Sequence, residues 1–406
     1  MNILFLTLSR ISDISERGIY TDLMREFIRN GHSIYIVVPA ERRFHQFTEL
    51  KESGGAKILH VKTLNIQKTN LIEKGIGTLL LEYQYQQAIE RFWKDVKFDL
   101  VLYSTPPITF NKVIASLKAR YQVKTYLLLK DIFPQNAVDL GMFSKKSLLH
   151  KLFRRKEKRL YNLSDYIGCM SPANVEYVLE HNPSVNPDKV EICPNSIELK
   201  SEDEYLIDKK VLLDKLNIPT EKCLFVYGGN LGRPQGVDFL MDVIAANEKR
   251  KDSYFVVVGN GTEYGRMKQW FDMNSPHNAC LLPSLPKVEY DNLVRICNVG
   301  LIFLDKRFTI PNYPSRLLSY MENKMPVLLA TDMKTDIGRI AEANGYGMWT
   351  ESGNLNGFME MIDGLITDES LMRIMGERGY SYLCTNYTVQ GGYQIIMKHF
   401  EQCVVS

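Results

Sequence analysis

Candidate phosphate-binding groups lie together at the start of one predicted helix. The stretch Thr309-Ile-Pro-Asn-Tyr-Pro-Ser-Arg-Leu-Leu-Ser-Tyr-Met-Glu322 is expected to form a loop and then a helix, between predicted strands at Val299–Leu304 and Pro326–Ala330. We expect Ser315 to be the N-cap and Arg316 to lie in the first turn. Unpaired N–H groups, a partial positive charge and a guanidinium at one helix end suit a phosphate group. An ordinary capped helix with a solvated Arg316 explains the same residues.

A second candidate is the glycine-rich turn Gly228–Gly236, which follows the predicted strand Leu224–Tyr227 and precedes a predicted helix. Glycines there allow the backbone to approach a phosphate closely, and Arg233 adds a permanent cation with a fork of donors. The turn at Gly259-Asn-Gly261 lacks the spacing of a dinucleotide-binding fingerprint, which disfavours a nicotinamide enzyme. Neither turn is followed by Gly-Lys-Ser/Thr, so neither is a Walker P-loop.

A charged pair, Lys130 and Asp131, directly follows the predicted strand Lys124–Leu129. Ligands of parallel α/β sheets bind at the carboxyl ends of strands, which places this pair at a candidate site. Asp131 could accept a hydrogen bond or a proton from a hydroxyl, with its pKa lowered by Lys130. A structural ion pair that closes the strand is an equally good interpretation.

A strongly basic helix is predicted at Lys145–Arg159, which holds eight Lys/Arg and one Glu. Helical spacing places Leu148 with Leu152, and Leu149 with Phe153, on shared faces. Such a run usually forms a solvated helix that packs by its apolar stripe. The alternative is a peripheral contact with an anionic membrane surface.

An alternation of strands and helices positions these groups. The strand Asn2–Leu8, the helix Ile19–Asn30 and the strand Ser33–Val38 form a βαβ unit, which implies a parallel sheet. The alternation continues with elements predicted at Asp99–Tyr103, Thr109–Tyr121, Lys124–Leu129, Ser147–Asn162, Tyr166–Met170 and Lys189–Ile192.

The alternation restarts after Leu199–Lys210, a charged segment without periodicity that we predict to be a linker. Later elements are predicted at Leu224–Tyr227, Val237–Asn247, Tyr254–Val258, Glu263–Phe271, Cys280–Leu282, Lys287–Cys297 and Val299–Leu304. A last helix, Val389–Val404, could cross back over the first domain. We therefore predict two doubly wound α/β domains, 1–198 and 199–385, that face a cleft, and a crossing helix within 386–406.

Composition excludes several classes of protein. At 406 residues the chain can bury large cores, and no apolar run is long enough to span a bilayer. Seven scattered cysteines without C-x-x-C, and seven dispersed histidines, argue against zinc sites and disulfides, and a reducing cytoplasm fits. Residues 1–198 carry 28 Lys/Arg against 21 Asp/Glu, hence +7, whereas residues 199–406 carry 22 against 26, hence −4. The two halves are therefore expected to face different partners, and nothing indicates nucleic-acid binding.

The order and spacing of several motifs resemble the GT-B retaining glycosyltransferases of family 4. The motifs are Ser104-Thr-Pro-Pro107, Asp131-Ile-Phe-Pro134 with Leu140-Gly141, Asn195-Ser196, the turn that ends Gln235-Gly-Val-Asp238, and Pro326-Val327. Two of them, at 104–107 and 131–134, are similar to the O-antigen and capsule subgroup that includes fucosamine transferases. The resemblance implies transfer of a sugar from a nucleotide sugar, such as a UDP-sugar, to a glycan or polyprenyl-diphosphate-linked acceptor, with retention of configuration and without a cofactor or metal.

By this resemblance the acceptor binds the first domain and the nucleotide binds the second. Arg233, Arg316, Asp131 and Lys130 are the implied catalytic residues. The implied donor-binding residues are Gly18, Asn230, Gly232, Gln235, Gly259, Leu285, Pro286, Lys287, Tyr313, Pro314, Ser315 and Ser319. Arg233, Arg316 and the helix start would stabilise the departing diphosphate, whose own oxygen would accept the proton of the acceptor hydroxyl.

The chain departs from the family pattern at four positions. Pro311 and Ser319 stand where most members carry two glutamates, Gln235 replaces the usual lysine, and Lys130 replaces a histidine. Two other functions therefore stay open. A nucleotide-sugar epimerase on the same architecture would convert the donor without an acceptor, and a non-catalytic binding protein would hold the donor without releasing nucleotide.

Overall fold

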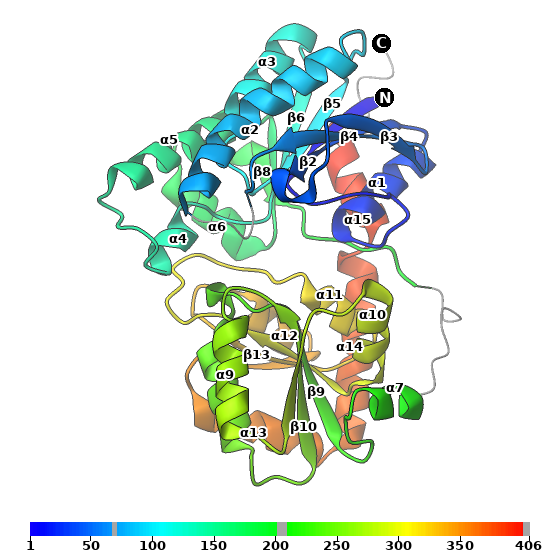
Figure 1. The fold of residues 1–406 in the computed structure, drawn as a ribbon, viewed down its shortest axis with the longest axis vertical. Coiled ribbons are helices and arrows are strands. Elements are labelled where there is room, and N and C mark those ends of the chain that lie inside the picture. Colours follow the sequence, from blue (N-terminus) through cyan, green and yellow to red (C-terminus); the bar gives the residue numbers. More distant parts are fainter. Residues whose placement is uncertain (67–70, 201–208, 401–406) are drawn as a thin grey trace. The chain divides into compact units, whose positions relative to one another are not determined.

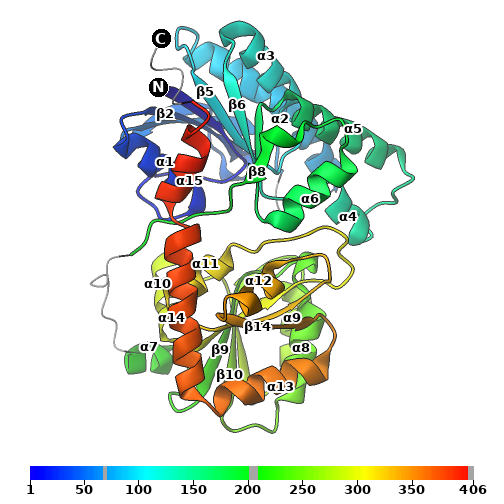
Figure 2. The same cartoon turned by 180° about the vertical axis from the view of Figure 1, so that it is seen from behind.

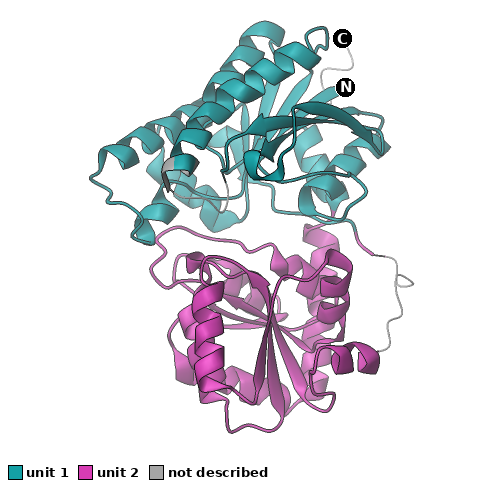
Figure 3. Cartoon of the chain, in the orientation of Figure 1, with its two compact units in different colours: residues 1–198, 389–406 teal, residues 199–388 magenta. Residues whose placement is uncertain are grey.

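The chain forms two compact units. The structure, a computed structural model, describes residues 1–66, 71–200 and 209–400. Unit 1 comprises residues 1–198 and 389–406, and unit 2 comprises residues 199–388 (Figure 3). Most of the predicted linker, residues 201–208, lies outside the described residues, whereas Lys209 and Lys210 already form the start of a helix.

Unit 1 contains an eight-stranded sheet in the order β3-β4-β2-β1-β5-β6-β7-β8. All neighbouring strands are parallel except β3, which runs antiparallel to β4 at one edge. The strands are β1 Asn2–Leu6, β2 Ser33–Glu41, β3 Glu49–Ser53, β4 Ala56–Thr63, β5 Leu100–Ser104, β6 Lys124–Leu129, β7 Tyr166–Cys169 and β8 Val190–Ile192.

Helices cover both faces of this sheet, as the near-continuous apolar strands require. They are α1 Ile19–Arg29, α2 Leu71–Phe92, α3 Asn111–Tyr121, α4 Gln135–Asp139, α5 Leu148–Leu163, α6 Pro172–His181 and α15 Val389–Met397. Helices α1 and α15 pack side by side and share a core with Ile3, Phe5 and Ile36 (Figure 2). Helices α2, α3 and α5 lie over the opposite face (Figure 1).

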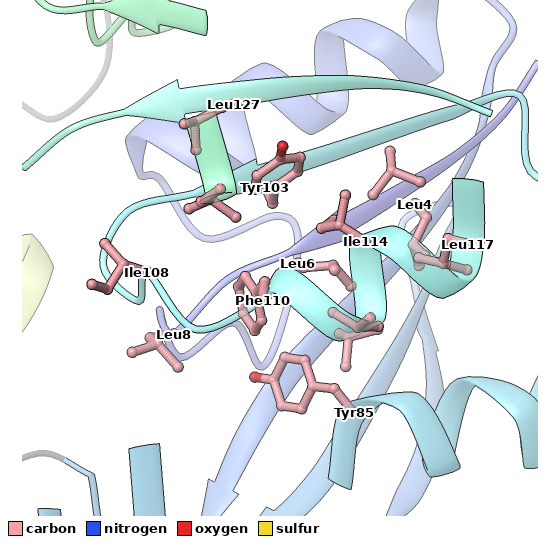
Figure 4. Packing of buried hydrophobic residues seen from close by; sticks show 14 of the residues in the cluster. Leu4, Leu6, Leu8, Tyr85, Tyr103, Ile108, Phe110, Ile114, Leu117 and Leu127 are labelled. Carbon is pink, nitrogen blue, oxygen red and sulfur yellow. The ribbon is translucent and has the colours of Figure 1, made fainter. Parts of the chain in front are cut away.

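The core under α2 and α3 is rich in aromatic side chains. Tyr85 of α2 stacks on Phe110, with ring centroids 5.4 Å apart, and both rings are fully buried beside Leu6 and Ile114 (Figure 4). The hydroxyl of Tyr85 donates to the backbone carbonyl of Thr7, at the carboxyl end of β1. This packing fixes the strand ends, because the interior of a protein is close-packed.

Unit 2 contains a fully parallel six-stranded sheet in the order β11-β10-β9-β12-β13-β14. Its strands are β9 Cys223–Asn230, β10 Ser253–Asn260, β11 Ala279–Leu282, β12 Val299–Phe303, β13 Val327–Thr331 and β14 Gly347–Glu351. Its helices are α7 Lys209–Lys215, α8 Val237–Ala246, α9 Tyr264–Asn274, α10 Lys287–Ile296, α11 Arg316–Glu322, α12 Ile337–Ala343, α13 Leu355–Ile366 and α14 Glu369–Asn386. The prediction of two doubly wound α/β domains is therefore confirmed.

Some elements differ from the sequence-based expectations. The strands β3 and β4 and the long helix α2 were not expected, and α14 extends to Asn386 within unit 2. The last predicted helix begins at Val389 as expected but ends at Met397, and residues 401–404 of the prediction lie outside the described residues. Within the described residues, no helix combines the length and the apolarity that a membrane span requires.

Candidate functional site

The candidate site in unit 2 lies at the carboxyl end of β9, where two consecutive glycines, Gly228 and Gly229, leave the strand without side chains. A Cβ atom at Gly228 would lie only 2.2 Å from the hydroxyl oxygen of Tyr290, so α10 packs directly onto the strand at this point. Gly229 has a φ of +117°, which favours glycine, and a Cβ there would lie 3.9 Å from Nη2 of Arg316. The backbone beside this guanidinium is therefore open.

Arg316 is held at this strand end by two groups. Its guanidinium carbon lies 4.3 Å from the ring centroid of Tyr227, and its Nη2 donates to the side-chain oxygen of Gln235. The Tyr227 hydroxyl oxygen lies 3.3 Å from the same Gln235 oxygen. Nη1 of Arg316 is buried and has no hydrogen-bond partner within the described residues. A buried guanidinium donor without a partner is costly, so the arrangement is suited to accept an anion.

Tyr320 fixes the helix that carries Arg316. Its fully buried hydroxyl lies 3.2 Å from the carbonyl oxygen of Val226 and 3.3 Å from that of Leu301, and it accepts from the N–H of Gly228 at 3.2 Å. Because residues four apart lie on one face of a helix, this anchor also determines where the side chain of Arg316 begins. The serine between them, Ser319, is half-buried on α11.

Three of the predicted donor-binding residues, Leu285, Pro286 and Lys287, which the family resemblance places beside the base, lie next to the same strand end. Leu285 and Pro286 precede α10, Pro286 is its N-cap residue, and Lys287 forms an ion pair with Asp291. One turn on, Tyr290 contacts Gly228 as described above. Burial raises the pKa of Tyr290 to about 12, and the positive charge of Arg316 acts in the opposite direction. Residues 285–287 and Arg316 are thus brought to one region through Tyr290.

Arg233 is positioned differently from Arg316. It begins the short helix η3, Arg233–Gln235, next to Gly232, but its side chain is 62% exposed. Its Nε lies 3.6 Å from the carboxylate of Glu263. Exposed pairs of this kind contribute little to stability, so this cation can exchange partners readily. Asn230, in the same turn, is exposed, and its carbonyl accepts from the Tyr227 hydroxyl at 3.0 Å.

The start of α11 corrects one expectation. The helix begins at Arg316, but the exposed Ser315 adopts a helical backbone conformation and makes no side-chain capping hydrogen bond. The helix has only seven residues. The guanidinium of Arg316, rather than a capped helix end, is therefore the main source of positive charge.

A chain of hydrogen bonds that starts just after β13 holds the loop before α11. Asp332, directly after that strand, accepts from the Thr335 hydroxyl at 2.8 Å, and the Thr335 hydroxyl oxygen accepts from the N–H of Asn312 at 3.0 Å. Tyr313 is half-buried and bonds the hydroxyl of Tyr387 at 2.5 Å, whereas Pro314 is half-buried beside it. Neither Asp332 nor Thr335 stood out in the sequence, because the bond to Asn312 spans 23 residues.

The glycines of the second turn have a packing explanation. A Cβ atom at Gly259 would lie 1.8 Å from the carbonyl oxygen of Gly229, and one at Gly261 would lie 2.2 Å from that of Leu231. The ends of β9 and β10 thus approach so closely that no side chain fits. This contact brings Gly259 to the candidate site as structural support for Gly229.

The predicted site residues of unit 1 have their own partners. The ammonium of Lys130 donates to the carbonyl of Cys193 at 3.0 Å, and its burial lowers its pKa. The carboxylate of Asp131 accepts from the amide of Asn136 at 2.8 and 2.9 Å. Lys130 and Asp131 thus each make a contact of their own at the carboxyl end of β6, and the influence of Lys130 on Asp131 stays a prediction.

Gly18 precedes α1 in an extended conformation, with a φ of 178°. Its N–H donates to the buried carboxylate of Asp22 at 2.9 Å, and its carbonyl accepts from the Thr21 hydroxyl. The N–H of Gly18 is therefore already engaged, so any approach to a ligand would use neighbouring atoms. Across the described residues, no group of three or more His, Cys, Asp or Glu side chains is placed to hold a metal ion.

Both halves of the chain match known families. Residues 19–201 match the sequence profile of Glycosyltransferase Family 4, and residues 208–382 match that of Glycosyl transferases group 1. The probable glycosyltransferase WbjE of Pseudomonas aeruginosa is 23% identical over 288 residues, which cover 69% of this chain and 68% of WbjE. The putative colanic acid biosynthesis glycosyl transferase WcaI of Escherichia coli strain K12 is 20% identical over 84% of this chain and 86% of its own.

Solved structures share the fold. Sucrose-phosphate synthase of Thermosynechococcus elongatus superposes with a TM-score of 0.77 at 13% identity, over 99% of each chain. HepE of Anabaena, solved in complex with UDP-glucose, superposes with a TM-score of 0.69 at 13% identity, over 99% of this chain and 100% of its own. Neither WbjE nor WcaI is named as a fucosamine transferase, so the similarity to that subgroup stays a prediction. The chain is a glycosyltransferase of the GT-B architecture, with a family 4 domain followed by a group 1 domain.

Proposed function

We propose that the protein is a retaining glycosyltransferase of surface polysaccharide biosynthesis, such as that of a capsule, an O-antigen or an exopolysaccharide. It transfers a hexosyl or N-acetylhexosaminyl group from a UDP-sugar to a hydroxyl of a glycan or polyprenyl-diphosphate-linked acceptor. The observation that carries this proposal is Arg316, whose buried Nη1 has no hydrogen-bond partner among residues 1–66, 71–200 and 209–400 and lies beside the open backbone of Gly229. A diphosphate supplies the missing acceptor.

The comparisons support a uridine nucleotide and a polysaccharide product. HepE was solved with UDP and with UDP-glucose, and the name of WcaI refers to colanic acid. Both likenesses cover most of this chain. The position of Leu285 and Pro286 at the start of α10, joined to the diphosphate region through Tyr290, suits a base that lies beside the diphosphate.

The chemistry that we propose requires no protein nucleophile. The bond between the anomeric carbon and the diphosphate oxygen breaks, the acceptor oxygen forms the new bond on the same face, and the leaving phosphate oxygen takes the acceptor proton. Negative charge develops on the diphosphate, next to Arg316. Arg233 can join it by exchanging its exposed contact with Glu263 for a phosphate oxygen. Removal of one such donor costs about 3–4 kcal/mol of transition-state stabilisation.

Two permanent cations, the positioned Arg316 and the exposed Arg233, can offset the charge that a divalent metal would otherwise neutralise. We therefore propose that transfer is independent of added metal. The assay checks this directly, because addition of a chelator should leave the rate of UDP release unchanged if the arginines are sufficient. A rate that depends on added Mg²⁺ or Mn²⁺ would refute this part of the proposal.

The test is release of UDP from a panel of UDP-hexoses and UDP-N-acetylhexosamines, with and without polyprenyl-diphosphate-linked sugars. Acceptor-dependent release, with a product of retained configuration, supports the transferase. Isomerised donor without acceptor would instead identify an epimerase. Tight donor binding without any release would identify a non-catalytic binding protein.

We also propose a peripheral contact between α5 and the membrane that carries a lipid-linked acceptor. Ser147 caps the helix by accepting from the N–H of His150 at 3.1 Å, and the only acidic residue, Glu157, is buried against Arg154. The outward face is therefore basic. Neutralisation of Lys151, Arg155 and Arg159 should weaken binding to anionic vesicles, and unchanged binding would refute the contact.

A further inference from the structure

Helix α2 carries an exposed apolar stripe. Four large apolar side chains recur at helical spacing on one face: Ile76, Leu79, Leu80 and Tyr83. Each is more than 40% exposed, and Tyr83 is 59% exposed. The opposite face buries Leu81, Tyr85 and Ile89 in the core. The helix is thus apolar on both sides, whereas a surface helix of a globular domain normally presents polar residues to water.

In the described part of unit 1, exposed large apolar side chains occur on α2 and around α5, in a second group before and on β3 (Phe44, Phe47 and Leu50), and singly at Ile192. Within the described residues, the exposed large apolar side chains of α5 and the loop before it are Met142, Leu148, Leu149 and Leu152, and Leu148 is 82% exposed. The corresponding residues of unit 2 are single positions on separate elements: Val211, Met273, Val288, Met333 and Ile374. Single exposed residues need no explanation, but a contiguous group marks an interaction site.

Helices α2 and α5 belong to one layer of unit 1. Both pack against α3 over the same face of the sheet, and Figures 1 and 2 show the three helices side by side. The carboxylate of Glu82, on the flank of α2, lies 3.9 Å from the ammonium of Lys156 of α5, and also accepts from the N–H of Lys112 of α3. The stripe and the basic helix are therefore parts of one outer surface.

The charge of this surface indicates which kind of partner it binds. Its exposed basic residues on α3, on α5 and before α5 are Lys112, Arg120, Lys145, Lys146, Lys151, Arg155, Lys158 and Arg159. On α2 the exposed charges Glu90 and Arg91 near its end have opposite signs and add no net charge. The single acidic residue of α5, Glu157, is buried. Apolar side chains between exposed cations match an anionic bilayer, which offers acyl chains beneath phosphate groups. A second copy of the same surface would bring like charges together.

We propose that α2 and α5 together form a membrane-binding surface for anionic phospholipid. The stripe Ile76, Leu79, Leu80 and Tyr83 enters the boundary between headgroups and acyl chains, and the basic face of α5 contacts the headgroups. The inference extends the proposed function, since it adds a second helix to the peripheral contact of α5. Membrane binding requires no sugar transfer, so either proposal can fail without the other.

Two variants distinguish the contribution of α2 to membrane binding from that of α5. The partition coefficient of each is measured by co-sedimentation with vesicles of phosphatidylglycerol and phosphatidylcholine. Leu79→Gln/Tyr83→Gln removes apolar side chains from α2 and should lower the partition coefficient about tenfold or more at every salt concentration. Lys151→Gln/Arg155→Gln/Arg159→Gln should lower it about a hundredfold at low salt, at about fivefold for each cation. The loss should shrink at high salt, because screening already weakens the wild-type contact.

Control variants test whether position matters. Met273→Gln changes an exposed apolar residue of α9, and Lys249→Gln/Lys251→Gln removes exposed cations from unit 2; both should leave vesicle binding unchanged. Thermal midpoints of all variants should match the wild type, since every substitution is at the surface. Wild-type vesicle binding by Leu79→Gln/Tyr83→Gln would overturn the proposal. A lipid-free dimer in light scattering that this variant dissociates would also overturn it, by identifying a second copy as the partner.

Discussion

The guanidinium of Arg316 lies over the ring of Tyr227, with 4.3 Å between the guanidinium carbon and the ring centroid. The two residues are brought together by Tyr320, whose hydroxyl bonds the carbonyls of Val226 and Leu301 between neighbouring strands. Because Arg316 and Gln235 also contact each other, one cation is held in place by three elements. A preorganised cation needs little reorganisation when negative charge develops next to it.

Gln235→Glu should inactivate the site while leaving the fold intact. The new carboxylate has the shape of the amide that now accepts from Arg316, so it would form an ion pair with the guanidinium and oppose an incoming diphosphate. One unit charge at this range, at an effective dielectric constant of about 20, is worth about 3 kcal/mol. We expect UDP affinity, measured by calorimetry, to fall about a hundredfold.

The matched control for this change is Gln269→Glu, an exposed position on α9 that should leave UDP affinity unaltered. If Gln235→Glu bound UDP as the wild type does, the diphosphate could not lie beside Arg316.

Gly228→Ala should destabilise unit 2. The added Cβ would meet the hydroxyl oxygen of Tyr290 at 2.2 Å, and overpacking of this kind costs about 1–3 kcal/mol. For a unit of this size, each kcal/mol lowers the thermal midpoint by about 2–4 °C. Gly265→Ala is the control, because nothing lies within 4 Å of its added Cβ.

The double variant Gly228→Ala/Tyr290→Ala should be more stable than the sum of the single effects, because the two side chains would contact each other directly. Additive losses would show that the collision between them is not the cause.

Lys130 should make the stability of unit 1 depend on pH. Burial lowers its pKa in the folded state below the ordinary value of 10.5, so in the window between these two pKa values the unfolded chain binds more protons. The contribution of Lys130 to the free energy of unfolding should therefore rise as pH increases through that window towards 10.5. Lys130→Met should abolish this rise in denaturant titrations, although it also removes the bond to Cys193. Parallel pH curves for wild type and variant would contradict the account.

The fold was predictable where apolar strands alternate with amphipathic helices bounded by glycine. Helix α1 illustrates this, because it ends at Arg29 shortly before Gly31. Helix α2 was missed because Gly75 and Gly77 interrupt its start and because its outward stripe is apolar, which removes the helical periodicity. An exposed apolar stripe suits the binding of a partner, but it also removes the alternation of polar and apolar residues from which a surface helix is predicted.

The site was predictable in its charges but not in its contacts. Arg316 and the turn at Gly228 were identified from the sequence, yet Gln235 and Arg316 are 81 residues apart and meet only in the folded sheet. The roles of Tyr290 and Tyr320 depend on the absence of side chains at Gly228 and Gly300. No local spacing indicates such a fit between distant residues.

The most direct test of the central claim is calorimetric titration of UDP into the wild type and Arg316→Gln, with Arg373→Gln of α14 as an exposed control in the same unit. Loss of one charged donor at a buried site predicts an affinity at least a hundredfold lower for Arg316→Gln, with an unchanged thermal midpoint without ligand and wild-type affinity for Arg373→Gln. If Arg316→Gln bound UDP with wild-type affinity, the buried guanidinium would not be the group that holds the diphosphate.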